Sequence, residues 1–157
     1  MPAPGFQLLS ALAPLRLVNG YGLFALMTTS RSEIIIEGSN DGETWRDYGF
    51  KFKPGDVRRA PRWVEPFQPR LDWQMWFAAL GDYQSSPWFS RLMLKLLEGS
   101  PPVLALLERN PFPESPPKYL RALVYDYAFT NWSECRATGR WWNRRLLGDY
   151  FPTVTLH

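Results

Sequence analysis

Residues 72 to 80 have the apolar pattern of a helix that is buried on nearly every side. Asp72 comes just before this pattern and is the predicted N-cap, because its carboxylate can accept hydrogen bonds from the first turn. Two tryptophans on one short helix need packing partners on several sides, so the pattern predicts a buried anchor helix. The stripe expected to face the core has the i, i+3, i+4, i+7 spacing and consists of Trp73, Trp76, Phe77 and Leu80.

A strand followed by a hairpin is predicted between residues 33 and 53. Residues 33 to 37 are a short β-branched run, typical of a strand buried on both faces. The next residues, Ser-Asn-Asp-Gly at 39 to 42, tolerate positive φ and predict a tight turn. After the turn, aromatic residues alternate with polar ones up to residue 53. This alternation indicates a second strand with one face in water.

Two more helices are predicted after residue 81. Ser86 and Pro87 supply an N-cap and a first-turn proline for a helix that reaches about Glu98, and Gly99 suits its C-terminal cap. Residues 100 and 101 repeat this start signal for a short helix that ends near residue 109. The sequence therefore predicts a helical block over about residues 71 to 109.

The C-terminal part of the chain predicts strands. Residues 119 to 130 alternate as a long central strand, in which Asp126 needs a partner or an exposed end. A loop through Gly139 should lead into a return strand at residues 140 to 147 and a last extended segment at 150 to 156. At 157 residues the chain fits one domain, which we expect over residues 16 to 157 after a flexible lead-in at 1 to 15. Residues 16 to 24 should begin the domain as an extended element.

The composition excludes several classes of function. The net charge of +3 is compatible with acidic partners, but no recognition motif accompanies it, so we expect no nucleic-acid partner. No run approaches the ~20 apolar residues of a membrane span, and the first residues lack the pattern of a signal peptide. The chain taken alone is therefore expected to be soluble. The compartment stays open at this point.

Catalytic groups are scarce. The single histidine is His157 at the chain end, and Cys135 is the single cysteine, so triads, disulfides and His- or Cys-rich metal sites lack a component. Glu33 and Glu37 lie about 13 Å apart on a strand, too far for a paired acid and base. The sequence predicts a protein that is not an enzyme and needs neither cofactor nor metal.

Two basic and aromatic clusters are candidates for binding a partner. Either cluster could face an anionic partner. Alternatively, the first cluster is a solvated loop, and the second is a strand in which arginine packs over indole. Arg70 has a second interpretation, an ion pair with Asp72 that locks the loop to the helix. Asn131 begins the pattern Asn-Trp-Ser and is a candidate glycosylation site. The candidate partner-binding residues are Arg58, Arg59, Arg62, Trp63 and Arg70 in the first cluster and Trp141 and Arg144 in the second.

Several motifs, taken in order, resemble the C-terminal region of the lipase maturation factor family over about residues 18 to 156. The longest block is specific enough that chance is a poor explanation. The blocks are Asn19-Gly20-Tyr21-Gly22-Leu23-Phe24, Ile36-Glu37-Gly38-Ser39, Lys53-Pro54-Gly55-Asp56, Gln68-Pro69-Arg70-Leu71-Asp72-Trp73-Gln74-Met75-Trp76-Phe77-Ala78-Ala79-Leu80, Asn110-Pro111-Phe112-Pro113, Pro116-Pro117-Lys118-Tyr119 and Gly139-Arg140-Trp141-Trp142.

The resemblance implies a non-enzymatic folding factor that assists dimeric lipases by binding the client protein. In animals it implies residence in the endoplasmic-reticulum membrane, with this domain on the lumenal side, and it also covers bacterial, membrane-associated members. In the family, a membrane-spanning part is expected before residue 18, and this sequence does not contain it. The resemblance therefore implies that a membrane-spanning part of the same family is a possible partner of the domain.

Residues 34 to 45 are also similar to a strand and turn of discoidin-like sandwiches. This similarity implies an α+β fold, namely a jelly-roll or galactose-binding-like β-sandwich with an inserted block of about three short helices. Three alternatives to client binding remain open. The first is a discoidin-like glycan-binding module, and the second is an enzyme of an unrelated kind, which would need a deep pocket lined by close carboxylates or by lysine and tyrosine. The third is a structural cap of a membrane protein.

Overall fold

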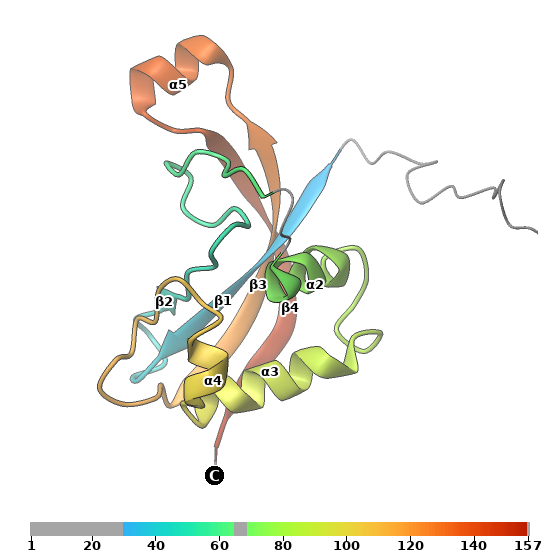
Figure 1. The fold of residues 1–157 in the computed structure, drawn as a ribbon, viewed down its shortest axis with the longest axis vertical. Coiled ribbons are helices and arrows are strands. Elements are labelled where there is room, and N and C mark those ends of the chain that lie inside the picture. The colour runs from blue at the N-terminus through green and yellow to red at the C-terminus, as the bar shows by residue number, and fades with distance from the viewer. Residues whose placement is uncertain (1–29, 65–68, 157) are drawn as a thin grey trace, which may run out of the picture.

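The computed structural model describes residues 30–64 and 69–156, so the predicted lead-in at 1 to 15 and the extended element at 16 to 24 lie outside it. Four described strands form one antiparallel sheet (Figure 1). In chain order they are β1 (Arg31–Ser39), β2 (Arg46–Asp47), β3 (Tyr119–Phe129) and β4 (Trp142–Thr155). In space the order is β2-β1-β3-β4. The predicted strands at 33 to 37 and 119 to 130 are confirmed.

β1 is buried on both faces, as its β-branched run predicts. Ile34 and Ile36 point into the larger core, whereas Ile35 belongs to a smaller cluster with Tyr127 and Trp142. Each isoleucine faces the same side of the sheet as its partner in β3, because antiparallel neighbours share their alternation. The sheet therefore carries apolar residues on both sides.

The predicted hairpin is present, but its second strand is short. β2 pairs only with Glu37 and Gly38 of β1, so the N-terminal half of this edge of β1 is not covered by β2. Tyr48 and Phe50 are nevertheless buried in the larger core. The candidate site lies near the half of β1 that β2 leaves uncovered.

Three helices lie on one side of the sheet: α2 (Arg70–Ala78), α3 (Pro87–Leu97) and α4 (Pro101–Leu104) (Figure 1). α3 starts at Pro87, and Gly99 follows it with a φ of 66°, which confirms the predicted start and C-terminal cap. Phe89 at the centre of this core is fully buried against Tyr150 and Phe151 of β4.

The predicted core face of α2 is wrong. The buried side chains are Leu71, Asp72, Met75 and Ala78, whereas Phe77 is 42% exposed and the two tryptophans are partly exposed. Slim or flexible side chains allow α2 to approach β1 closely, and the bulky rings pack on one another instead. The predicted N-cap is wrong as well, because Pro69 precedes the helix and Asp72 lies inside its first turn.

The C-terminal segment differs from its prediction in two places. The predicted loop through Gly139 contains a helix, α5 (Trp132–Thr138), which begins after Asn131 and lies at the far end of the β3–β4 pair (Figure 1). The return strand and the last extended segment are one long strand, β4, with irregular pairing. Asp126 has the partner it was predicted to need, since Arg145 Nη2 lies 3.5 Å from its Oδ2.

The described residues thus have an α+β fold, but a jelly-roll or galactose-binding-like sandwich is not confirmed. Residues 30–64 and 69–156 hold one four-stranded sheet, and α2 and α3 pack where a sandwich would place its second sheet. The helices of this part of the chain are all too short or too polar to cross a membrane.

Truncating one buried side chain of α2 and one exposed side chain just after its C-terminal end tests this packing. Met75→Ala removes a fully buried side chain, and we expect it to lower the free energy of unfolding by about 2–5 kcal/mol. Leu80 belongs to the stripe predicted to be buried but is 57% exposed, so Leu80→Ala should change the free energy by less than about 0.5 kcal/mol. Urea denaturation measures both, and a larger loss for Leu80→Ala would contradict the structure.

A pH dependence follows from Tyr48, because burial raises the pKa of its phenol. Above pH ~10 the unfolded chain releases this proton and the folded chain keeps it, so stability falls as the pH rises. The stability difference between the wild type and Tyr48→Phe should therefore shift against the wild type by up to about 1.4 kcal/mol per pH unit above pH ~10. Denaturation curves between neutral and alkaline pH measure it, and parallel profiles would refute it.

Candidate functional site

The outward face of α2 carries a cluster of aromatic rings. Trp73 and Trp76 have ring centroids 5.0 Å apart, and Phe77 lies 5.1 Å from each of them. Trp63, from the loop before α2, is 83% exposed and lines the same cavity as the two helix tryptophans. We refer to Trp63, Trp73, Trp76 and Phe77 as the aromatic patch.

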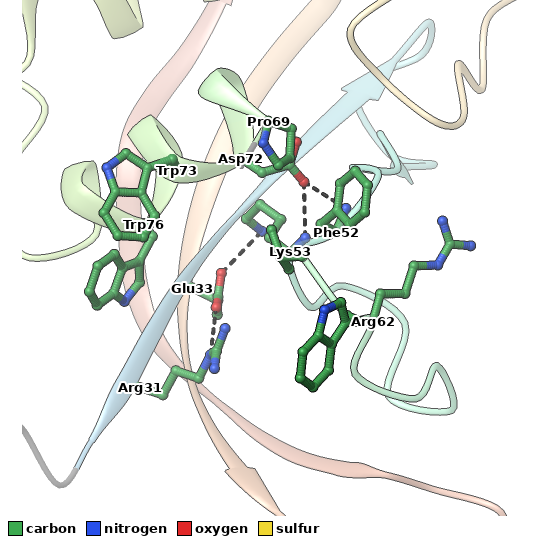
Figure 2. A pocket seen from close by; sticks show the side chains of 11 residues that line it. Arg31, Glu33, Phe52, Lys53, Arg62, Pro69, Asp72, Trp73 and Trp76 are labelled. Carbon is green, nitrogen blue, oxygen red and sulfur yellow. Dashed lines mark hydrogen bonds and ion pairs between the residues drawn. The ribbon is translucent and has the colours of Figure 1, made fainter. Parts of the chain in front are cut away.

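A cavity of about 460 Å³ lies between this patch and the N-terminal half of β1 (Figure 2). Its volume is within the range of about 300–1,000 Å³ that is typical of small-ligand sites. Figure 2 shows charged side chains between the α2 tryptophans and Arg62. The apolar lining consists of Phe52, Trp63, Val64, Pro69, Trp73 and Trp76, and the charged lining consists of Arg31, Glu33, Lys53, Arg62 and Asp72.

Glu33 brings a carboxylate to this cavity from β1. The residue is 1% exposed, and its Oε1 accepts a 2.8 Å hydrogen bond from Arg31 Nε. Its Oε2 lies 3.4 Å from Lys53 Nζ. A buried carboxylate is tolerated only when cations or donors compensate for lost water, and here two cations flank it.

Lys53 closes the edge of β1 that β2 leaves uncovered. Its Nζ donates hydrogen bonds to the carbonyl oxygens of Ile34 at 2.8 Å and Pro54 at 3.0 Å. Burial lowers the pKa of this ammonium, and the Glu33 carboxylate opposes that shift. The side chain takes the place of a further strand by satisfying a main-chain acceptor.

Asp72 joins α2 to the same edge. Its Oδ1 accepts hydrogen bonds from the backbone N–H groups of Phe52 at 2.7 Å and Lys53 at 2.9 Å. Its Oδ2 is buried and accepts no hydrogen bond from residues 30–64 and 69–156, whereas the buried Oε2 of Glu33 is paired with the ammonium of Lys53. The charged groups beside the cavity therefore mainly compensate one another, through Arg31, Glu33 and Lys53.

The structure uses two of the candidate arginines to hold their own loop in place. Arg59 and Arg62 each lie 2.6 Å from a carboxylate oxygen of Glu108. Arg59 also donates to the carbonyl oxygen of Phe50 at 2.7 Å, and both arginines donate to that of Lys51. These contacts fix the loop that carries Trp63.

Arg58, in the loop that carries Trp63, and Arg70, the first residue of α2, are both exposed. The predicted ion pair between Arg70 and Asp72 is not formed, because Asp72 points to the backbone of residues 52 and 53. Arg70 can therefore meet solvent or a partner.

The second cluster packs against the loop of the first. The backbone N–H groups of Trp141 and Trp142 donate to the carbonyl oxygen of Val57, and Trp142 Nε1 donates to that of Arg59 at 2.8 Å. Arg144 lies over the Tyr125 ring at 4.8 Å. The structure thus joins the two clusters through residues 57 to 59, with the arginine over a phenol ring rather than an indole.

Asn131 is exposed at the start of α5. Its Oδ1 accepts from the backbone N–H of Glu134 at 2.8 Å and from Ser133 Oγ at 2.6 Å. Its position at the surface is compatible with glycosylation, which stays a prediction.

Glu33, Lys53 and Asp72 were not predicted as site residues. A glutamate at the start of a β-branched strand run was a usable signal, since a charged residue at a buried position needs compensation. The partnership with Lys53 and Asp72 joins positions far apart in the chain, which no local pattern shows.

A family model described as the lipase maturation factor C-terminal domain matches residues 17–152. Lipase maturation factor 2 of Rattus norvegicus is 47% identical over 156 residues, which cover 96% of this chain and 22% of that protein. The Homo sapiens protein of the same name is also 47% identical over 156 residues, with the same coverage.

Lipase maturation factor 1 of Bos taurus is 44% identical over 154 residues, which cover 93% of this chain and 28% of that protein. The chain thus spans 22% to 28% of the length of these relatives. No solved structure matches it.

Removing the charged side chains of Arg70 and Asp72, both in the first turn of α2, should change the free energy of unfolding by very different amounts. Asp72→Ala leaves two backbone N–H groups without their acceptor, and we expect a loss of about 3 kcal/mol in the free energy of unfolding. Arg70→Ala should cost less than about 0.5 kcal/mol, because Arg70 is exposed. Chemical denaturation measures both. Equal losses would indicate the Arg70–Asp72 pair that the sequence predicts.

Proposed function

Because the chain belongs to the lipase maturation factor family, we propose that it is a client-binding module that assists the folding of dimeric lipases without catalysing a reaction. The relatives are named for lipase maturation, which supports a role in lipase folding. The proposal adds that the module contacts the lipase polypeptide itself before its folding is complete.

The observation that carries the proposal is the aromatic patch. Trp63 is 83% exposed and Phe77 is 42% exposed, although most aromatic side chains of this size are covered when a domain folds. The rings of Trp73, Trp76 and Phe77 pack on one another, and Trp63 lines the same cavity as the two α2 tryptophans. Exposed apolar patches mark surfaces that bind partners, and tryptophan is enriched among residues that dominate binding energy. An incompletely folded client exposes apolar segments that such a patch can cover.

The elements that carry the aromatic patch are held in place by hydrogen bonds and ion pairs, so the patch is preorganised. Arg59 and Arg62 hold the Trp63 loop through Glu108, and Asp72 holds the start of α2. A patch built on fixed elements loses little conformational entropy on binding. We assign Arg58 and Arg70 to its rim, where their charges would orient acidic client segments.

The proposal extends to the cellular setting. We infer that the module lies on the lumenal side of the endoplasmic-reticulum membrane in animal members, beside the membrane-spanning part of the same family. The candidate glycosylation residue Asn131 is exposed at the start of α5, at the opposite end of the β3–β4 pair from α3 and α4 (Figure 1).

Removing exposed rings tests client binding. We expect the double variant Trp63→Ala and Phe77→Ala to weaken binding to a monomeric lipase diluted from denaturant by at least about tenfold, since two hot-spot side chains are lost. Trp132→Ala is the matched control, because Trp132 is 64% exposed but lies on α5. Biolayer interferometry with the whole chain measures the affinities.

Circular dichroism verifies that each variant is folded. Binding that survives in the folded double variant, or that Trp132→Ala weakens equally, would refute the aromatic patch as the client site. A wild-type chain that binds no lipase at all would support the structural-cap alternative instead.

A further inference from the structure

The domain that the family shares begins before the part of the chain that the structure describes. The family model matches residues 17–152, whereas the described part starts at residue 30. Residues 17–29 therefore belong to the domain, unlike residues 1 to 16, which precede the match. We refer to residues 17–29 as the N-terminal segment.

The N-terminal segment has the composition of chain that is covered in a folded domain. It carries no charged residue, and its apolar side chains include Tyr21, Leu23, Phe24, Leu26 and Met27. Leucine, phenylalanine and methionine are among the residues that are most often buried. The burial of such side chains offsets the conformational entropy that is lost when a segment is ordered. An apolar site within reach of the segment is therefore its natural place.

The cavity at the aromatic patch begins where this segment joins the described part. Arg31 is the first residue of β1 and lines the cavity, and only Ser30 separates it from the segment. Extended chain advances by about 3.3 Å per residue, so the segment can turn at Ser30 and run back along the N-terminal half of β1. A short tether gives an effective concentration of about millimolar, which favours this segment over a separate molecule.

The charged groups beside the cavity already have partners, which favours an uncharged occupant. Glu33 Oε1 lies 2.8 Å from Arg31 Nε, and Glu33 Oε2 lies 3.4 Å from Lys53 Nζ. Arg62 Nη2 lies 2.6 Å from Glu108 Oε1. A charged occupant would compete with these contacts. An apolar occupant packs on the tryptophans and leaves the ion pairs in place.

β1 also offers main-chain groups at this edge. The carbonyl oxygens of Ile34 and Ile36 point to the β2 side, because they accept hydrogen bonds from Lys53 Nζ and from the backbone N–H of Tyr48. Alternate residues of a strand direct their main-chain groups to the same edge, so Ser32 faces it as well. Among residues 30–64 and 69–156, no backbone group is hydrogen-bonded to Ser32 on that edge. An extended segment can bond there.

We propose that the N-terminal segment of this chain occupies the cavity, with Phe24 and its neighbours packed on Trp73 and Trp76, and that a client segment has to displace it. The segment then covers these tryptophans while no client is bound, and so regulates the site. The displacement rests on the proposed function, whereas the occupancy of the cavity does not. Client segments that win this competition are uncharged and apolar, as the N-terminal segment is.

Photo-cross-linking in the whole chain tests the occupancy. A photoreactive benzoylphenylalanine in place of Phe24 keeps an aromatic ring and should cross-link, within one chain, to the tryptic peptide 71–91 that contains Trp73 and Trp76. The same group in place of Phe6 is the matched control, because Phe6 lies outside the residues that match the family, and it should give no such product. Mass spectrometry of the monomeric band measures both yields.

Affinity for a lipase tests the displacement. Phe24→Asp puts a charge into the segment and should release it from the cavity, so binding of a monomeric lipase diluted from denaturant should tighten by at least about threefold. Phe6→Asp makes the same change before the segment and should leave the affinity unchanged. Circular dichroism verifies folding, and Phe24→Ala replaces Phe24→Asp if the latter does not fold.

The occupancy would be overturned if position 24 gave no cross-link to peptide 71–91, if position 6 gave an equal yield, or if the product appeared only in dimers. Equal lipase affinities of the wild type and the folded Phe24 variant would overturn the displacement. The proposed function fails separately. A lipase that binds neither the wild type nor the variant removes client binding and leaves the cross-linked segment in its place. A lipase that binds while position 24 gives no cross-link does the reverse.

Discussion

The carboxylate of Asp72 sets the position of α2, because one of its oxygens accepts hydrogen bonds from the backbone N–H groups of Phe52 and Lys53. These two residues lie beside the half of β1 that β2 does not cover, and Lys53 continues the contact to the Ile34 carbonyl and to Glu33. A short helix and a strand edge are thus joined by charge-assisted hydrogen bonds, which are stronger than neutral ones. The rest of the site depends on this joint.

The joint also determines which face of α2 reaches solvent. With Asp72 directed at the backbone of residues 52 and 53, Met75 and Ala78 follow on the same side of the helix and become buried. The rings of Trp73, Trp76 and Phe77 are then left on the outer side, where they pack on each other. The exposed aromatic patch is therefore a consequence of where one buried carboxylate finds its donors.

The sequence predicts the elements well and the site poorly. α3, with Ser86-Pro87 before it and Gly99 after it, and β1, with its isoleucine run, are determined by local signals that the structure confirms. α2 is apolar all round, so periodicity could not identify its core face. That choice depends on donors at residues 52 and 53, nearly twenty positions earlier in the chain. α5 was missed because its seven residues have little apolar periodicity and depend on Asn131 for their start.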